Sequence, residues 1–131
     1  MAETFLFELV TPERLALSEQ VDMVEVPGEL GDFGVLVGHA PFFSMIRPGV
    51  IAVHKGDAIE RFFVPAGYAE VNPEGCRVLA EHVTAMTSAT REMAEAKLLE
   101  AQEKLAGAEN DVQRKRAEKA LEAAQTFRDL M

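Results

Sequence analysis

The chain has 131 residues, of which 48% are hydrophobic and 27% are charged, and its formal net charge is −9. This composition is typical of a globular protein with room for one domain, or for a small domain and an appendage, and it excludes a disordered chain. The acidic balance argues against a nucleic-acid partner, because a phosphate backbone is bound through Lys and Arg.

Short β-prone runs separated by turn residues fill residues 1–87. In the first run Phe5, Phe7 and Leu9 lie on one face by the two-residue period of a strand. The expected strands are residues 4–10, 15–19, 21–26, 34–37, 42–46, 50–54, 58–64, 68–71 and 76–86. About ten short strands with no helix between them predict an antiparallel β-sandwich or flattened barrel. They disfavour a parallel sheet with crossover helices.

Glycine and proline concentrate in residues 27–49, which hold five of the nine glycines and three of the six prolines. We interpret this segment as tight turns between short strands, with Asp32 and His39 displayed on rigid loops. Its glycines do not form a phosphate cradle, because neither a lysine nor a helix follows them. The apolar residues of the segment are expected to build a core: Phe33, Val35, Val37, Phe42, Phe43, Met45 and Ile46.

The composition changes after residue 87, and residues 88–131 contain no proline, one glycine and abundant helix formers. Gly107 is expected to end a first helix, and Asn110 with Gln113 resembles a capping box that opens a second. Small and apolar side chains form one stripe on each helix: Ala94, Leu98, Ala101 and Leu105, then Ala117, Ala120, Leu121, Ala124, Phe127 and Met131. We therefore expect a β-sandwich domain over residues 1–87 and an antiparallel two-helix hairpin over residues 88–131.

The sequence carries no catalytic signature, because phosphate-loop, nucleophile-elbow and zinc-protease motifs are all absent. His39, His54 and His82 have no spacing that suggests a shared metal, and the single cysteine, Cys76, is expected in the core. His39 either bonds nearby backbone or contacts a partner. We predict an interaction module without cofactor or metal, rather than an enzyme.

Three stretches together support a resemblance. Residues 27–41 read PGELGDFGVLVGHAP, Arg47-Pro48-Gly49 follows, and residues 66–71 and 78–81 read AGYAEV and VLAE. This pattern, followed by an Ala-, Glu- and Lys-rich helical tail, resembles the epsilon subunit of F-type ATP synthases. The mitochondrial relative called delta is similar.

The resemblance implies a non-catalytic subunit of the central rotor stalk, which links the gamma subunit to the c ring and couples proton flow to ATP synthesis. It implies partner contacts to the c ring and gamma at Asp32, His39, Gly31 and Gly38, and contacts of the hairpin to the alpha and beta subunits. No membrane span or secretory signal is expected. The resemblance therefore implies a peripheral protein at the cytoplasmic face of the inner membrane, held there through the complex, with the mitochondrial matrix side disfavoured.

The hairpin departs from the family pattern in one motif and carries a cluster to which the family assigns a role. Some epsilon subunits bind ATP through an [I/L]-D-x-x-R-A motif, but here Ala89 and Glu92 stand at its Asp and Arg positions. An anion in place of a cation predicts that nucleotide is not bound. The resemblance assigns inhibition of ATP hydrolysis to a basic cluster on the second helix, for which the alternative is a solvated helix face: Arg114, Lys115, Arg116 and Lys119.

Two other functions remain as alternatives from the residues alone. One is a stand-alone β-sandwich adaptor that dimerises through its helical tail, although the stripes are shorter than a sustained coiled coil requires. The other is a small-molecule-binding sandwich or enzyme in which Asp32 and His39 form an acid–base pair.

Overall fold

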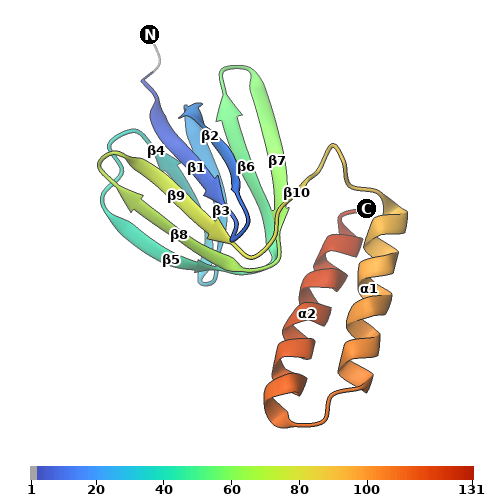
Figure 1. Cartoon of the computed structure of the whole chain (residues 1–131). Coiled ribbons are helices and arrows are strands. Elements are labelled where there is room, and N and C mark those ends of the chain that lie inside the picture. Colours follow the sequence, from blue (N-terminus) through green and yellow to red (C-terminus); the bar gives the residue numbers. More distant parts are fainter. Residues whose placement is uncertain (1–2) are drawn as a thin grey trace. The chain divides into compact units, whose positions relative to one another are not determined.

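The computed structural model describes residues 3–131, and the chain divides into two compact units at the junction of Thr87 and Ser88. The first unit contains all the strands and the second contains both helices (Figure 1).

The first unit is one continuous sheet of ten strands that curls into a sandwich (Figure 1). Along the sheet the order is β10-β7-β6-β3-β5-β8-β9-β1-β2, and β4 pairs with β3. The strands are β1 Phe5–Val10, β2 Leu15–Val21, β3 Met23–Gly28, β4 Gly31–Leu36, β5 Phe42–Ile46, β6 Gly49–Lys55, β7 Ala58–Val64, β8 Gly67–Asn72, β9 Gly75–Ala80 and β10 Thr84–Ala85. The predicted β-sandwich of about ten strands, followed by two helices, is confirmed.

Strand pairing is antiparallel in the described residues except between β1 and β9, which pair in parallel from Leu6↔Gly75 to Val10↔Leu79. A parallel pair needs a long connection between its strands, and seven other strands intervene here. Alternation within single strands carries no information about this direction, so the sequence does not predict the pair.

The segment expected as one strand over residues 76–86 is in fact two strands, β9 and β10, and this prediction was wrong. β9 lies beside β8, whereas β10 lies beside β7 at the far end of the strand order. The amide of Glu81 donates to the Ala66 carbonyl (3.2 Å) and that of Met86 to the Arg61 carbonyl (2.9 Å). The chain therefore leaves one part of the sheet and joins another within a few residues.

The core of the sandwich consists of the side chains that alternate inward. Phe7 and Leu9 are fully buried, as the two-residue period predicts. Burial of each such side chain stabilises the fold by about 1.5–3 kcal/mol. The other large side chains that are fully buried among the described residues of this unit are Val21, Val24, Val26, Val35, Ile51, Val53, Val64 and Val78.

The second unit is an antiparallel hairpin of α1, Arg91–Ala106, and α2, Asp111–Asp129 (Figure 1). Gly107 follows α1 and donates its amide to the Glu103 carbonyl (3.0 Å), as expected of a helix end. The Asn110 side chain accepts a hydrogen bond from the Gln113 amide (2.9 Å). Gln113 in turn accepts from the Glu109 amide (2.9 Å), so the predicted capping box is present with its return bond shifted by one residue.

The stripe predicted on each helix is buried in part. Ala94 and Ala101 of α1 are buried, as are Ala117, Ala124 and Phe127 of α2. Ala120 is exposed, contrary to prediction, and Ala123 is buried instead. Ala120 lines a groove of about 400 Å³ beside the connecting loop, where the helices do not close on each other.

Candidate functional site

The β3–β4 turn, residues 28–32, carries the first predicted contact residue. Pro27↔Asp32 and Gly28↔Gly31 are the last cross-strand pairs, so Glu29 and Leu30 form the tip. Leu30 is fully exposed at 102% relative accessibility. A side chain at Gly28 would place its Cβ 2.6 Å from the Gly31 carbonyl oxygen, which only glycine avoids.

Arg47, after the end of β5, holds this turn from outside. Its Nη1 donates to the Gly28 carbonyl (2.6 Å) and its Nη2 to the Asp32 carboxylate (2.5 Å). Its backbone amide donates to the Pro27 carbonyl (3.0 Å). The sequence does not predict Arg47 as a site residue, although Arg47-Pro48-Gly49 is part of the pattern that carries the family resemblance.

His39 lies at the other end of β4. Its Nδ1 donates to the Ala40 carbonyl (2.8 Å), its amide donates to the Leu36 carbonyl (3.1 Å), and Gly38 before it has φ +79°. Its ring meets that of Phe42 edge-on, with centroids 6.3 Å apart. Most of β4 lies between Asp32 and His39, and each strand residue adds about 3.3 Å to their separation. The structure does not bring the two side chains together as an acid–base pair.

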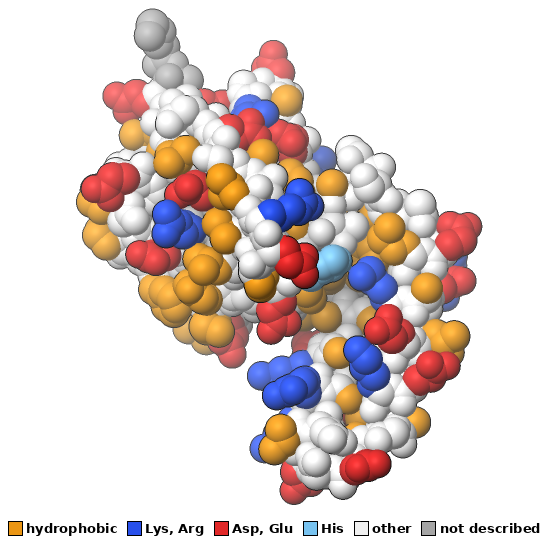
Figure 2. All heavy atoms as spheres, viewed as in Figure 1, with side chains coloured by type: hydrophobic (Ala, Val, Ile, Leu, Met, Phe, Trp, Pro, Cys, Tyr) orange, Lys and Arg blue, Asp and Glu red, His pale blue; other side chains and the backbone are white. Residues whose placement is uncertain are grey.

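Several apolar residues expected in the core lie on the surface instead, and for these the prediction was wrong. Phe42, Phe43 and Met45 of β5 are exposed, as is Val37, whereas Ile46 is buried. Phe43 and Met45 pair with Glu70 and Tyr68 on the outer face of the sheet. Phe42 faces inward but lies at an open edge, because β5 touches β3 only at the pair Gly28↔Ile46. Figure 2 shows hydrophobic side chains gathered on the surface where β5 and β8 lie.

Aromatic contacts order the exposed side chains on both faces of β5. The rings of Phe33 and Phe42 meet edge-on with centroids 5.0 Å apart, and those of Phe43 and Tyr68 lie 5.2 Å apart. An exposed apolar face beside the β3–β4 turn has the character of a surface for a protein partner.

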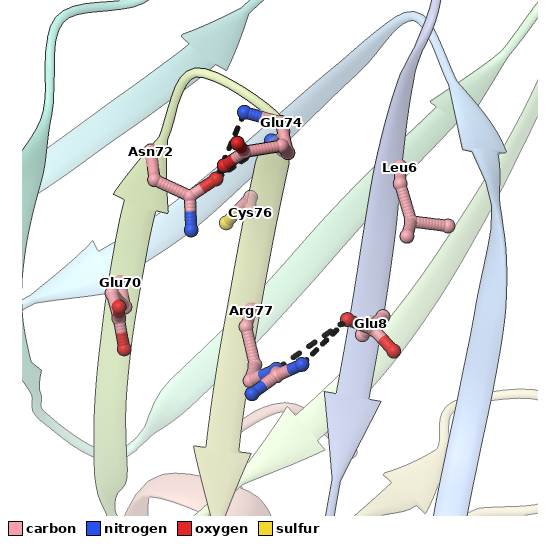
Figure 3. Close-up of a pocket in the computed structure, with 8 residues that line it drawn as sticks. Leu6, Glu8, Glu70, Asn72, Glu74, Cys76 and Arg77 are labelled. Carbon is pink, nitrogen blue, oxygen red and sulfur yellow. Dashed lines mark hydrogen bonds and ion pairs between the residues drawn. The ribbon is translucent and has the colours of Figure 1, made fainter.

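A pocket of about 300 Å³ lies on the outer face of β1, β8 and β9 (Figure 3). Within it Arg77 donates to the Glu8 carboxylate (3.1 Å), and Asn72 Oδ1 accepts from the amides of Glu74 and Gly75. Burial raises the pKa of the Cys76 thiol beneath it to about 12, so the sulfur is not a nucleophile near neutral pH.

Two absences among the described residues concern metal clusters and membrane-spanning helices. Within residues 3–131 no group of three or more His, Cys, Asp and Glu side chains is placed to hold a metal ion. No helix among these residues has the length and apolarity of a membrane span. The predicted core position of Cys76 is confirmed, at 3% exposure.

The residues of the predicted basic cluster all lie on α2 and are exposed. Arg114 donates to Asp111 (2.8 Å), whereas Lys115, Arg116 and Lys119 have no ion-pair partner among the residues described. The cluster therefore retains three cations that are available to a partner.

The positions of the nucleotide motif lie at the start of α1. Ala89 precedes the N-cap, Thr90, whose hydroxyl accepts from the Met93 amide (3.1 Å). Glu92 is an exposed anion in the first turn, and Arg91 donates to Glu95 (3.5 Å). The Glu92 carboxylate stands where the motif has a cation.

Residues 4–86 match the family described as "ATP synthase, Delta/Epsilon chain, beta-sandwich domain". The chain is 44% identical over 128 residues to the ATP synthase epsilon chain of Rhodospirillum rubrum, which covers 97% of this chain and 96% of that relative. It is 49% identical over 112 residues to the ATP synthase epsilon chain of Paramagnetospirillum magneticum, with 85% and 84% covered. A chain of the Euglena gracilis mitochondrial ATP synthase (OSCP/F1/c-ring) has the same fold, with a TM-score of 0.77 at 22% identity over 97% of this chain and 81% of that one.

Proposed function

Because the chain belongs to the ATP synthase delta/epsilon family, we propose that it is the central-stalk subunit that joins gamma to the c ring and couples proton flow to ATP synthesis. The single observation that carries this proposal is the 44% identity that extends over 97% of this chain and 96% of an epsilon chain, and so includes both units. A subunit of this family is non-catalytic, in agreement with the prediction of an interaction module.

The β domain supplies the contact to the ring in this proposal. The β3–β4 turn projects Leu30 and Glu29, and the loop around Gly38 and His39 lies at the other end of β4. Both are fixed by backbone hydrogen bonds and by glycines in conformations other residues rarely adopt. Rigid loops of this kind transmit torque without yielding, and the exposed face of β5 adds apolar area for gamma.

The hairpin supplies regulation in this proposal, by restraining ATP hydrolysis. Lys115, Arg116 and Lys119 offer unpaired cations to acidic segments of the alpha and beta subunits. Nucleotide does not take part, because Glu92 is an anion where a triphosphate would require a cation. The protein acts at the cytoplasmic face of the inner membrane, where it is held by its partners.

Two variants of the whole subunit test the proposal after assembly with the other synthase subunits. Asp32→Lys combined with His39→Ala is expected to weaken co-purification with gamma and the c ring and to lower coupling. Deletion of the residues after Ala89 is expected to leave assembly intact and to raise ATP hydrolysis. Unchanged coupling in the first variant would refute the contact site at Asp32 and His39. Unchanged ATP hydrolysis in the second would refute the restraint of hydrolysis by the hairpin.

A further inference from the structure

The β3–β4 turn lacks the local features that fix a two-residue hairpin turn. Turns that match the twist of paired strands have positive φ at their first central residue. No residue other than glycine has positive φ in the described chain, so neither Glu29 nor Leu30 supplies it. Gly31, after the tip, takes φ +140°. Contacts from outside the hairpin therefore add to Gly28 and Gly31 in fixing the conformation of the tip.

Those contacts come from the end of β5 and from Arg47, which follows it. The Glu29 amide donates to the Met45 carbonyl (2.8 Å), and the Arg47 amide donates to the Pro27 carbonyl (3.0 Å). The Arg47 guanidinium then joins the two sides of the turn, one nitrogen on the Gly28 carbonyl and the other on the Asp32 carboxylate.

Arginine is suited to this position by its planar fork. Two nitrogens of one rigid group reach two acceptors at a fixed separation, which a lysine ammonium on a flexible stem does not reproduce. The Arg47 side chain is 43% exposed and that of Asp32 is 74% exposed. An ion pair this open adds little to global stability, so its consequence is the geometry of the turn.

The same contacts change the part played by Asp32. Its carboxylate is engaged within the protein, whereas the Glu29 carboxylate has no ion-pair or hydrogen-bond partner among the residues described. Leu30 beside it is fully exposed. The turn therefore presents one apolar side chain and one free anion.

We propose that Arg47 is a positioning residue that, through Gly28 and Asp32, holds Leu30 and Glu29 in the orientation that meets the c ring. This inference rests on the proposed function, which supplies the partner. A partner surface that fits has an apolar depression beside a cation or amide donor. Fixing the tip before contact removes the entropy cost of ordering it during binding.

The test uses the full chain added back to a synthase from which this subunit has been removed, and measures the concentration that restores half of ATP-driven proton pumping. Arg47→Met is expected to raise that concentration about tenfold, and Arg47→Lys by less, because order at the tip is lost or partly lost. The matched control is Arg77→Met, which breaks another exposed arginine–carboxylate pair, to Glu8, and is expected to change nothing.

Two further measurements separate positioning from general damage. Amide ¹⁵N relaxation of Glu29 and Leu30 in the free chain is expected to report a fall in order parameter, from about 0.85 to below ~0.6, in Arg47→Met only. The unfolding midpoint of Arg47→Met is expected to equal that of Arg77→Met. A midpoint well below the control would overturn the inference, because Arg47 would then act on the whole domain.

The variant Leu30→Ser distinguishes failure of this inference from failure of the proposed function. If Leu30→Ser restores pumping at the normal concentration, the turn is not the contact and the proposed site is wrong. If Leu30→Ser weakens restoration while Arg47→Met matches Arg77→Met, the contact stands and the positioning role of Arg47 is refuted.

Discussion

Single residues in the β domain are constrained most where two backbones pass without room for a side chain. At Gly75, where β9 meets β1, an added Cβ would lie 2.1 Å from the Leu6 carbonyl oxygen. At Gly67 it would lie 2.2 Å from the Leu79 carbonyl oxygen. Both contacts are to paired backbone, which cannot move without breaking the ladder.

Gly75→Ala is therefore expected to destabilise the β domain by about 3 kcal/mol, since the strand pair must separate to admit the methyl group. Urea unfolding followed by circular dichroism measures this free energy. Gly107→Ala is the control, because its nearest neighbour would be 3.5 Å away and its φ is −92°, and it is expected to change stability by less than about 1 kcal/mol. Equal stabilities for the two variants would contradict the packing argument.

Burial of Cys76 gives the fold a pH dependence at alkaline pH. Burial raises the thiol pKa from 9.0 to about 12, so above pH 9 the unfolded chain loses this proton and the folded chain keeps it. The free energy of unfolding therefore falls by up to about 1.4 kcal/mol per pH unit as pH rises above the unfolded pKa. Cys76→Ala is expected to lose this component, so that between neutral pH and pH ~10 the urea midpoint of the native chain falls more steeply than that of the variant. Parallel pH profiles would show that the thiol ionises in the folded state.

The contact residues could be predicted from sequence only in part. Asp32 and His39 stand out because glycines surround them. Arg47, the partner of Asp32, does not stand out. It follows 15 positions later, and no local sequence pattern predicts an ion pair between residues so far apart in the chain. Sequence position therefore identifies the display loop, whereas the fold alone identifies what holds it.

At the scale of elements, α2 begins at a cap in which two side chains accept hydrogen bonds from backbone amides. Asn110 accepts from the Gln113 amide and Gln113 accepts from the Glu109 amide, each at 2.9 Å. The basic residues of α2 follow within two turns, so the cap also fixes where the cluster begins.

Asn110→Ala is expected to destabilise the start of α2 by about 1 kcal/mol, because the Gln113 amide loses its acceptor. Hydrogen exchange of the first-turn amides of α2 measures the local opening, which should become about fivefold faster. Asn110→Asp keeps an acceptor oxygen and should exchange like the native chain. Equal protection in all three proteins would mean that the cap does not limit opening.

The strands could be predicted well where alternation and turns are local, as in Phe5, Phe7 and Leu9 of β1. The exposure of Phe42 and Phe43 could not, because it depends on which face of the sheet is covered and on the edge that β5 leaves open. The split into β9 and β10 could not be predicted either, because β-prone residues continue through the bend between these two strands. The exposure of β5 and the limits of β9 and β10 thus depend on which strands pair, and not on the β-propensity of their residues.

At the scale of the whole molecule, charge is divided unevenly between the two units. Residues 1–87 hold 5 Lys and Arg against 13 Asp and Glu, a net of −8, whereas residues 88–131 hold 8 against 9, a net of −1. The acidic unit and the nearly neutral hairpin therefore favour partners of different charge.

Neutralising Lys115, Arg116 and Lys119 together by substitution with Gln is expected to raise ATP hydrolysis by the assembled synthase about two- to fivefold. This corresponds to roughly 0.4–1 kcal/mol of lost contact, as for exposed ion pairs. Steady-state hydrolysis at low salt measures the effect. Glu118→Gln, on the same helix, is the control and should not raise the rate. Similar rates of ATP hydrolysis for the triple variant and the native chain would show that these three side chains are solvated and do not contact a partner.

The parallel pairing of β1 with β9 has a consequence for how the protein is made. Glu8 and Arg77, which meet across these strands, are 69 residues apart. At a synthesis rate of about 5–20 residues per second, β1 leaves the ribosome several seconds before its partner exists. During that interval β2 is the neighbour that β1 can pair with, and the other edge of β1 stays open. The sandwich therefore closes on the nascent chain only after β9 has emerged.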